Sequence, residues 1–306
     1  PAAGFPLRLL EAGALKQVSW TVRLRTVAGA PAGLIEAARI LDQERPRAVF
    51  SLGGYASGPV TLIALAKEIP IVVMEPNALP GLAHRLIGRF ARRALLGFEQ
   101  AGRYFPPGRW EVSGIPIREE FFAVAPRRHQ PPWTVLVTGG SQGSHRLNKT
   151  ALECFTLWKP GRVCFLHQTG EREYDEVCSG YREAGGAAEV SPFLADMPGV
   201  FARADVVVCR AGASTVAELC AAGRAAILVP FPFAADQHQL RNAEAMQAAG
   251  AARLVRDAEL TGERLYQELR ALLEEPGRLE AMEAAARRLA RPGAARRAAE
   301  VLEACD

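Results

Sequence analysis

The chain has 306 residues and a mass of 33.0 kDa, more than one hydrophobic core usually holds, so we expect two domains. Its 49% hydrophobic and 23% charged residues are typical of globular proteins, and a net charge of +4 allows attraction to an anionic surface without requiring nucleic acid. The longest apolar runs, 69–74 and 225–231, are of strand length and exclude a membrane span, while the six cysteines form no CxxC pair, which excludes the common metal and redox motifs.

Strand-like and helical stretches alternate along the first half of the chain. The predicted strands are 48–52, 71–74, 94–97 and 110–112, and the predicted helices are 32–43, 60–67 and 82–90. Pro116 and the proline-bearing stretch 125–132 then indicate a linker. This order is typical of an α/β domain with a parallel sheet.

The second half repeats the alternation. The predicted strands are 133–138, 163–167, 188–190, 205–208 and 226–229, and the predicted helices include 144–157, 215–222, 265–274, 279–289 and 292–305. We therefore predict an α/β protein with two Rossmann-like parallel-sheet domains that face each other across a cleft. The expected bounds are 1–118 for the first domain, 119–290 for the second, and 291–306 for a C-terminal helix that packs back on the first.

The stretch DVVVCRAGASTVAELCAAG (205–223) indicates a nucleotide site. A buried strand feeds a helix through a turn of small residues, so free N–H groups and the positive end of the helix dipole point at one spot, which suits a phosphate. Glu218, predicted three residues into the helix, would then accept hydrogen bonds from a ribose. The alternative is an ordinary helix start, with Glu218 as a first-turn acid that complements the dipole.

Two further glycine-rich turns follow predicted strands, GGYASGP (53–59) and GGSQG (139–143). In open α/β sheets, ligands bind at the carboxyl ends of the strands, where all three turns are expected. The chain has no GxSxG, HExxH or GxxxxGK[ST] motif, and GxGxxG occurs at neither strand turn. These absences argue against hydrolases, kinases and dehydrogenases.

The stretch FPFAADQHQLRN (231–242) places polar groups at the start of a helix. Gln239 and Asn242 are three residues apart and share a face, and amides suit the hydroxyl groups of a sugar. The alternative is a polar helix start with Asp236 as the cap. His238 has no second ligand at metal spacing, so no metal site is expected.

Glu75 and Asn77 end a strand of the first half, where an acid could act as a general base or anchor an acceptor hydroxyl. An acid at that place could equally cap a loop. Further on, the stretch 84–95 alternates arginines with apolar residues, which is consistent with an interfacial membrane contact. An ordinary solvated helix face is the alternative for this stretch.

Taken together, these motifs resemble the MurG family of peptidoglycan N-acetylglucosaminyltransferases. The resemblance rests on SLGGYASGP (51–59), MEPNALPG (74–81), SGIPIR (113–118), TGGSQGS (138–144), HQTG (167–170), PFLADM (192–197), CRAGASTVAE (209–218) and DQHQLRNA (236–243). It implies the glycosyltransferase-B (GT-B) architecture, with UDP-GlcNAc bound mainly by the second domain and a membrane-embedded acceptor by the first.

The resemblance assigns site residues motif by motif. It implies that Ser141 and Gln142 contact the diphosphate and sugar, that Glu218 holds the ribose, and that Phe193 and the Leu194 backbone meet the uracil. It implies further donor-site residues at Arg210, Gly212, Ala213 and Ser214, and contacts to the GlcNAc hydroxyls from Gln239 and Asn242. The acceptor side would comprise Tyr55, Ser57, Glu75, Asn77 and Arg118.

The chain departs from the family pattern at three places. The family's first glycine-rich loop, GGTGGH, carries a histidine considered for catalysis and is expected upstream of Pro1, so we expect an N-terminal portion to precede this sequence. Met74 stands where a histidine is common, and Ile115 replaces the asparagine of GNP. Within the sequence as given, Glu75 is then the best candidate for the catalytic base.

The expected reaction is inverting transfer of GlcNAc from UDP-GlcNAc to the C4 hydroxyl of the MurNAc of lipid I, giving lipid II and UDP in peptidoglycan synthesis. The resemblance implies no cofactor and no metal. Partners would be UDP-GlcNAc, lipid I and an anionic membrane surface, with no nucleic acid, at the cytoplasmic face of the cell membrane; free cysteines in apolar runs also favour the cytoplasm. The alternatives are another GT-B enzyme with a lipid acceptor, a sugar-nucleotide epimerase, and a UDP-sugar-binding module without turnover.

Overall fold

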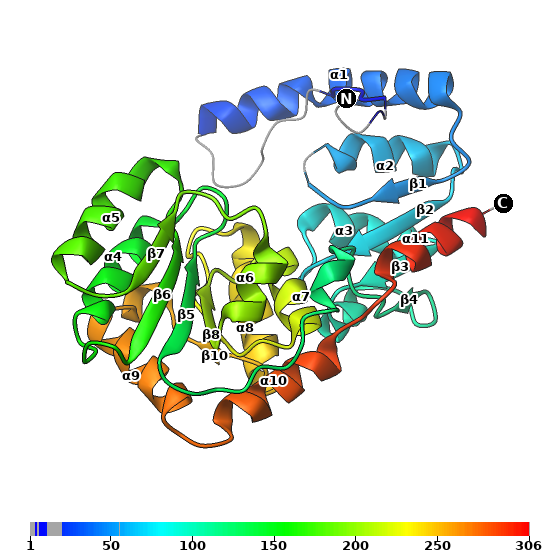
Figure 1. Cartoon of the computed structure of the whole chain (residues 1–306). Helices are drawn as coiled ribbons and strands as arrows, with labels where there is room; N and C mark the ends of the chain where they lie inside the picture. The colour runs from blue at the N-terminus through cyan, green and yellow to red at the C-terminus, as the bar shows by residue number, and fades with distance from the viewer. Residues whose placement is uncertain (1–3, 5, 11–19, 55, 306) are drawn as a thin grey trace. The chain divides into compact units, whose positions relative to one another are not determined.

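A computed structural model describes residues 4, 6–10, 20–54 and 56–305, and they form two units (Figure 1). Unit 1 comprises Pro1–Ile115 and Gly293–Asp306, and unit 2 comprises Pro116–Pro292. Each unit contains one parallel β-sheet with helices packed on it. The predicted fold class, two parallel-sheet α/β domains, is confirmed.

Unit 1 has a four-stranded parallel sheet in the order β1-β2-β3-β4. Its strands are β1 (Val49–Ser51), β2 (Ile71–Glu75), β3 (Arg93–Leu96) and β4 (Trp110–Glu111). Its helices are α1 (Trp20–Glu44), α2 (Ser57–Ala66), α3 (Leu82–Ile87) and α11 (Ala294–Glu303), with 3₁₀ turns at Gly88–Phe90 and Glu99–Tyr104. The C-terminal helix α11 is tied to β4, because Nε of Arg297 lies 2.8 Å from Oε1 of Glu111.

Three helices of unit 1 differ from the prediction by three residues or more, and one of them, α2, begins at Ser57 rather than at residue 60. Helix α1 begins at Trp20 rather than at residue 32 and runs through Pro31, although a proline inside a helix usually marks its boundary. The predicted helix 82–90 is α-helical only to Ile87 and ends in a 3₁₀ turn. Gly88 begins that turn against the Phe105 ring, where an added Cβ would lie 2.7 Å from a ring carbon.

Unit 2 has a six-stranded parallel sheet in the order β10-β9-β8-β5-β6-β7. Its strands are β5 (Trp133–Thr138), β6 (Val163–Gln168), β7 (Ala188–Ser191), β8 (Val206–Cys209), β9 (Ala226–Leu228) and β10 (Arg253–Leu254). Its helices are α4 (His145–Phe155), α5 (Tyr174–Glu183), α6 (Met197–Arg203), α7 (Ala213–Ala222), α8 (His238–Ala248), α9 (Gly262–Leu273) and α10 (Arg278–Leu289). Figure 1 shows α4 and α5 on one face of this sheet and α6 and α7 on the other.

The central strands of unit 2 are buried on both faces, which is why they read as continuous apolar runs. Alternate residues of β5, such as Val135 and Val137, pack with α4, α5 and α9 in the main core. The Phe155 ring meets the rings of Phe165 and Tyr181 edge to face in this core, and those two rings are tilted against each other.

A buried ionic cluster secures residues 125–132, the stretch predicted as a linker, to the rest of unit 2. Oδ1 of Asp205, just before β8, accepts hydrogen bonds of 2.8 Å from Nε of Arg127 and from His129, while Oδ2 accepts from the Thr134 amide. On its other side, Nε2 of His129 lies 3.3 Å from a carboxylate oxygen of Glu283. Because Asp205 precedes its strand, the cluster lies at the amino ends of the strands, at the opposite end of the sheet from the predicted site.

Beside that cluster, Arg224 is fully buried and also serves the segment 125–132. Its Nε donates to the carbonyl of Phe201 at 2.7 Å, and one of its terminal nitrogens donates to the carbonyl of Ala125 at 2.9 Å. The other terminal nitrogen lies 3.2 Å from Glu283, which balances its charge. A buried guanidinium is tolerated only with such partners.

Candidate active site

The register of the unit 2 sheet brings the predicted donor-site loops into one row. Thr138 at the end of β5 pairs with Gln168 of β6 and with Cys209 of β8, and Cys209 pairs in turn with Leu228 of β9. On the other side, Gln168 pairs with Ser191 of β7. Five neighbouring strands therefore end at the same level, and their loops share the sheet edge where ligands of open α/β sheets bind.

The turn after β8 leaves a helix N-terminus open. Helix α7 begins at Ala213, two residues earlier than predicted; Gly212 is its N-cap and makes no side-chain capping bond. Helices have unpaired N–H groups in their first turn, and those of α7 have no capping side chain and no first-turn acid. The N-terminus of α7 thus has the properties of an anion site, with Ser214 exposed beside it.

Glu218 lies in the second turn of α7, not in the first. The alternative interpretation, that it complements the helix dipole as a first-turn acid, is therefore wrong. Burial raises the pKa of its carboxyl group, and the positive charge of Arg118 opposes that shift. Within the described part of the chain, this half-buried carboxylate has no hydrogen-bond partner. Its oxygens can therefore accept hydrogen bonds from a ligand.

The glycine-rich loop after β5 packs backbone to backbone against the loop after β6. Gly143 and Gly170 both have positive φ. A Cβ added to Gly143 would lie 1.8 Å from the Thr169 carbonyl oxygen, and a Cβ added to Gly170 would lie 2.4 Å from the Gln142 carbonyl oxygen. The Gln168 side chain fixes the loop further by donating to the Gly140 carbonyl at 2.8 Å. Ser141 and Gln142 are exposed at its tip, as donor-site residues must be.

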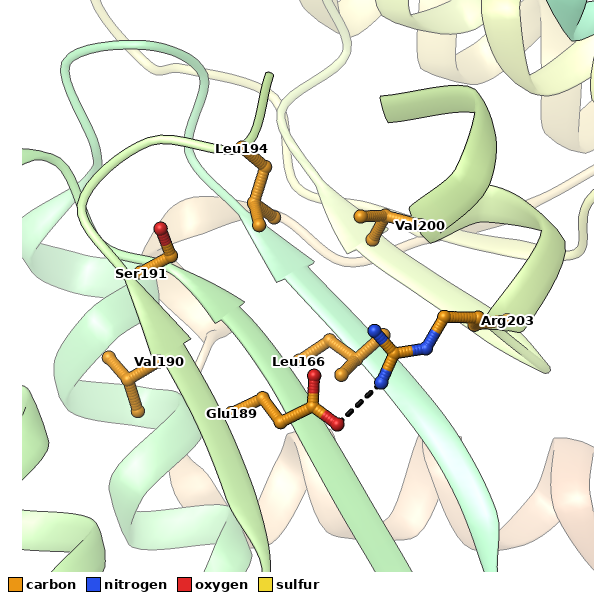
Figure 2. Close-up of a pocket in the computed structure, with 7 residues that line it drawn as sticks. All are labelled: Leu166, Glu189, Val190, Ser191, Leu194, Val200 and Arg203. Carbon is orange, nitrogen blue, oxygen red and sulfur yellow. Dashed lines mark hydrogen bonds and ion pairs between the residues drawn. The ribbon is translucent and has the colours of Figure 1, made fainter. Parts of the chain in front are cut away.

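The loop after β7 is joined to the same glutamine. The Leu194 amide donates to Oε1 of Gln168 at 3.1 Å, so Leu194 offers a ligand its carbonyl rather than its N–H, and Phe193 is 56% exposed. Figure 2 shows a pocket below this loop, with Leu194 at one end and the Glu189–Arg203 ion pair at the other. Its volume of about 160 Å³ is small for a nucleotide, so the row of loops, not this pocket, is the candidate donor site.

Two predicted donor-site side chains are engaged with the protein itself. Nη1 of Arg210 lies 2.5 Å from Oδ1 of Asp257, and Nη2 donates to Oγ of Ser144, the N-cap of α4, at 2.8 Å. Asn242 is 0% exposed and donates to the Ala211 carbonyl at 3.2 Å. In this structure both side chains shape the turn after β8 instead of presenting polar groups to solvent.

Gln239, in contrast, is half-buried and has one amide end in use. Its Oε1 accepts a hydrogen bond of 2.9 Å from the Phe231 amide, which directs its NH₂ group away as a donor for a ligand. The backbone just before α8 is strained, since Asp236 and Gln237 have φ of 50° and 56°. Gln237, and not Asp236, occupies the N-cap position of α8, and the Gln237 side chain makes no capping bond.

In unit 1, Glu75 is only 2% exposed and its carboxylate is already occupied. Oε1 accepts bonds from the backbone and side-chain nitrogens of Asn77, and Oε2 accepts from the Gly81 amide and from Nδ1 of His84 at 2.7 Å. Ser57, also assigned to the acceptor side, donates to the Gly54 carbonyl at 2.9 Å. Tyr55 lies outside the described residues.

Arg118, predicted for the acceptor side, belongs to unit 2. One of its terminal nitrogens donates to the Ala195 carbonyl at 3.3 Å, in the loop after β7, and its guanidinium stacks 5.2 Å from the centre of the Phe121 ring. Its charge also acts on Glu218. The structure thus groups Arg118 with residues predicted for the donor side, which motif order alone did not indicate.

Comparison with known proteins agrees with this arrangement. Residues 134–299 match the glycosyltransferase family 28 C-terminal domain, and residues 2–96 match the glycosyltransferase family 28 N-terminal domain. The chain belongs to this family. A relative in Solibacter usitatus, a UDP-N-acetylglucosamine–N-acetylmuramyl-(pentapeptide) pyrophosphoryl-undecaprenol N-acetylglucosamine transferase, is 47% identical over 99% of this chain and 83% of its own length. The transferase of the same name from Myxococcus xanthus is 41% identical over 98% of this chain and 80% of its own length.

Solved structures place family 28 within a wider fold group. The crystal structure of MurG from Acinetobacter baumannii is 27% identical, with a TM-score of 0.80, over 98% of this chain and 85% of that one. A UDP-GlcNAc 2-epimerase from Neisseria meningitidis shares 13% identity over 94% of this chain and 84% of that one, with a TM-score of 0.62, which shows a common fold alone. The predicted membership of the MurG family and the GT-B fold class is confirmed.

Proposed function

We propose that this chain transfers GlcNAc from UDP-GlcNAc to the C4 hydroxyl of the MurNAc of lipid I, with lipid II and UDP as products. The observation that carries the proposal is the uncapped N-terminus of α7 in the same row as the exposed 139–143 turn. Together they offer unpaired N–H groups to a diphosphate, and Glu218 follows one helical turn later for the ribose. The transferase names of the relatives support the same reaction.

The reaction forms a bond between the acceptor oxygen and the anomeric carbon of GlcNAc while the bond from that carbon to the UDP oxygen breaks. The proton of the C4 hydroxyl passes to a base, and negative charge develops on the departing diphosphate. Backbone N–H groups and the dipole of α7 would stabilise that charge without reorganising. Gln239 would donate its NH₂ group to a sugar hydroxyl, which favours the correct sugar.

The structure changes the role that we propose for Glu75. Glu75 is only 2% exposed, and both oxygens of its carboxylate already accept hydrogen bonds from protein groups, so neither oxygen is accessible to an acceptor hydroxyl. We therefore assign Glu75 to holding Asn77 and the 76–81 loop for the acceptor, rather than to proton transfer. This differs from the sequence-based prediction of Glu75 as the base.

For the acceptor's membrane, we propose contact through α3 and the turn that follows it, at the cytoplasmic face. Leu82, Leu86 and Phe90 are four residues apart along this stretch and are 39%, 61% and 45% exposed, and Arg89 and Arg92 are exposed beside them. Apolar side chains flanked by arginines favour an anionic interface. Across the described residues, no helix has the length and apolar character needed to cross a bilayer.

The test is a turnover assay with UDP-GlcNAc and a lipid I analogue in vesicles, in which released UDP and the new disaccharide lipid are both quantified. Equal amounts of the two products are expected. Transfer to diacylglycerol instead would favour another lipid glycosyltransferase, and epimerised UDP-sugar without an acceptor would favour an epimerase. Calorimetric binding of UDP-GlcNAc with no transfer would support a binding module and contradict the proposal.

A further inference from the structure

A buried chain of hydrogen bonds in unit 1 joins the two loops assigned to the acceptor. Nδ1 of His84, on α3, lies 2.7 Å from Oε2 of Glu75 at the end of β2, and its Nε2 lies 3.2 Å from Oγ of Ser51 at the end of β1. The Gly53 amide donates to the same Ser51 oxygen at 3.3 Å. All three side chains are at most 3% exposed.

The donors and acceptors of this relay are mutually consistent. The tautomer with its proton on Nδ1 satisfies every member: the ring donates to Glu75, Nε2 accepts the Ser51 hydroxyl proton, and the Ser51 oxygen accepts from the Gly53 amide. With the proton on Nδ1, the relay links the Gly53 N–H to the carboxylate that holds the 76–81 loop. Such fully satisfied buried networks specify a single local arrangement.

Packing reinforces the same link. Gly53 has φ of +83°, and an added Cβ would lie 3.1 Å from Cε1 of the His84 ring, so the backbone of the first loop rests on the imidazole. The other nitrogen of the ring orients Glu75, which fixes both nitrogens of Asn77. His84 thus lies against the backbone at Gly53 and is linked through Glu75 to the 76–81 loop.

We infer that His84 is a positioning residue for the acceptor: it sets the turn at Gly53 and the 76–81 loop relative to each other by bonding to Ser51 and Glu75 at once. The inference rests on the proposed function, in which these loops bind the acceptor sugar. His84 touches no reacting atom, and its effect passes through Glu75 to Asn77 and through Ser51 to Gly53. Its loss should weaken acceptor binding and leave donor binding unchanged.

The experiment compares His84→Phe, which keeps a ring but removes both nitrogens, with His84→Asn, whose amide can replace the Nδ1 donor to Glu75. With a lipid I analogue, His84→Phe should raise the acceptor KM about tenfold while the UDP-GlcNAc KM stays within about twofold. His84→Asn should recover most of the loss. Ser51→Ala should have a smaller effect, and adding it to His84→Phe should cost nothing more, because both remove the same link.

Leu41→Ala is the matched control, because Leu41 lies in the core of the same unit and is not a member of the relay. Assays at a temperature where all variants are folded should show no rise in acceptor KM for Leu41→Ala. Hydrogen exchange gives a readout without turnover: His84→Phe should speed exchange of the Gly53, Asn77 and Gly81 amides, and segment 139–143 of unit 2 should not change.

The outcomes separate the inference from the proposed function. If His84→Phe only lowers stability, as Leu41→Ala does, with acceptor KM and loop exchange unchanged, the inference is wrong. If the wild type transfers no GlcNAc to lipid I, the proposed function fails, while the exchange experiment still reports on the relay. Faster loop exchange combined with an unchanged acceptor KM would show a purely structural relay and would also overturn the inference.

Discussion

Replacing His129 with glutamine should destabilise unit 2 in a pH-dependent way. His129 donates to Asp205 and lies beside Glu283, and its side chain is only 5% exposed. Burial by itself would lower the pKa of His129, but hydrogen bonds to the two carboxylates, and their charges, raise it from 6.5 to about 9. A histidine with a raised pKa stabilises the folded state fully below its unfolded pKa, and this contribution is lost as the pH rises through the folded pKa.

The expected magnitude follows from the two pKa values. A shift of this size corresponds to about 3 kcal/mol of stability at pH 6, about 1.4 kcal/mol at pH 8 and about zero at pH 10. The neighbouring charges within reach are Asp205, Glu283, Arg127 and Arg224. Burial by itself would raise the pKa of Asp205, but its hydrogen bonds to His129, Thr134 and Arg127 lower it, so this partner stays ionised throughout that pH range.

The assay is urea unfolding of the full chain at the three pH values, followed by pulsed hydrogen exchange in peptides of β5 and β8. The difference between wild type and His129→Gln should shrink steadily as the pH rises. Arg128→Gln is the matched control, since Arg128 is an exposed neighbour, and its effect should be small at every pH. A His129→Gln difference that is equal at pH 6 and pH 10 would refute the reasoning and leave His129 as a packing residue.

Three further predictions concern ligands. Glu218→Ala should weaken UDP binding about 10- to 100-fold in calorimetry, because it removes a hydrogen bond to a charged group, and it should not change the thermal stability. An unchanged affinity for UDP would show that Glu218 is not part of the ribose site. Gln239→Glu keeps an oxygen for the Phe231 amide but removes the NH₂ donor, so UDP-GlcNAc should bind about tenfold more weakly while UDP binds as before. Equal losses of affinity for UDP-GlcNAc and for UDP would indicate that Gln239 contacts the nucleotide instead of the sugar. Arg89→Glu combined with Arg92→Glu should weaken the free energy of binding to anionic vesicles, measured by sedimentation, by about 1 kcal/mol per charge and leave binding to zwitterionic vesicles unchanged. Unchanged binding to anionic vesicles would show that the membrane contact lies elsewhere.

The sequence predicted the sheets well because buried parallel strands have a local signature. β5 was placed at its observed ends, and the other predicted strands were placed to within a residue or two. Helix ends were less certain, because they depend on caps and on prolines. Because a proline usually marks a helix boundary, Pro31 led to a predicted start of α1 that is too late. The small residues before α7 gave no signal that its first turn begins at Ala213.

Side-chain roles were harder to predict, because the residue type determines which hydrogen bonds a side chain can make but not which group will be its partner. Arg210 and Asn242 stand in the predicted donor motifs, yet their bonds go to Ser144, Asp257 and a backbone carbonyl. His84 was noted only as part of a basic stretch, and no spacing rule links it to Ser51, which lies 33 residues away. Partners that come together only through the tertiary fold leave no periodic signal in the sequence.

Within the predicted donor motifs, side chains and backbone groups have different roles. Among the polar side chains of the donor motifs, Arg210 and Asn242 fix the turn after β8, and the groups that we propose for anion binding are backbone N–H groups that no side-chain substitution removes. What such a site cannot tolerate is added volume, because Gly143 and Gly170 have no room for a Cβ against the neighbouring backbone. Single side-chain changes at the donor site should therefore weaken binding by graded amounts, whereas a Cβ at either glycine should displace both loops at once.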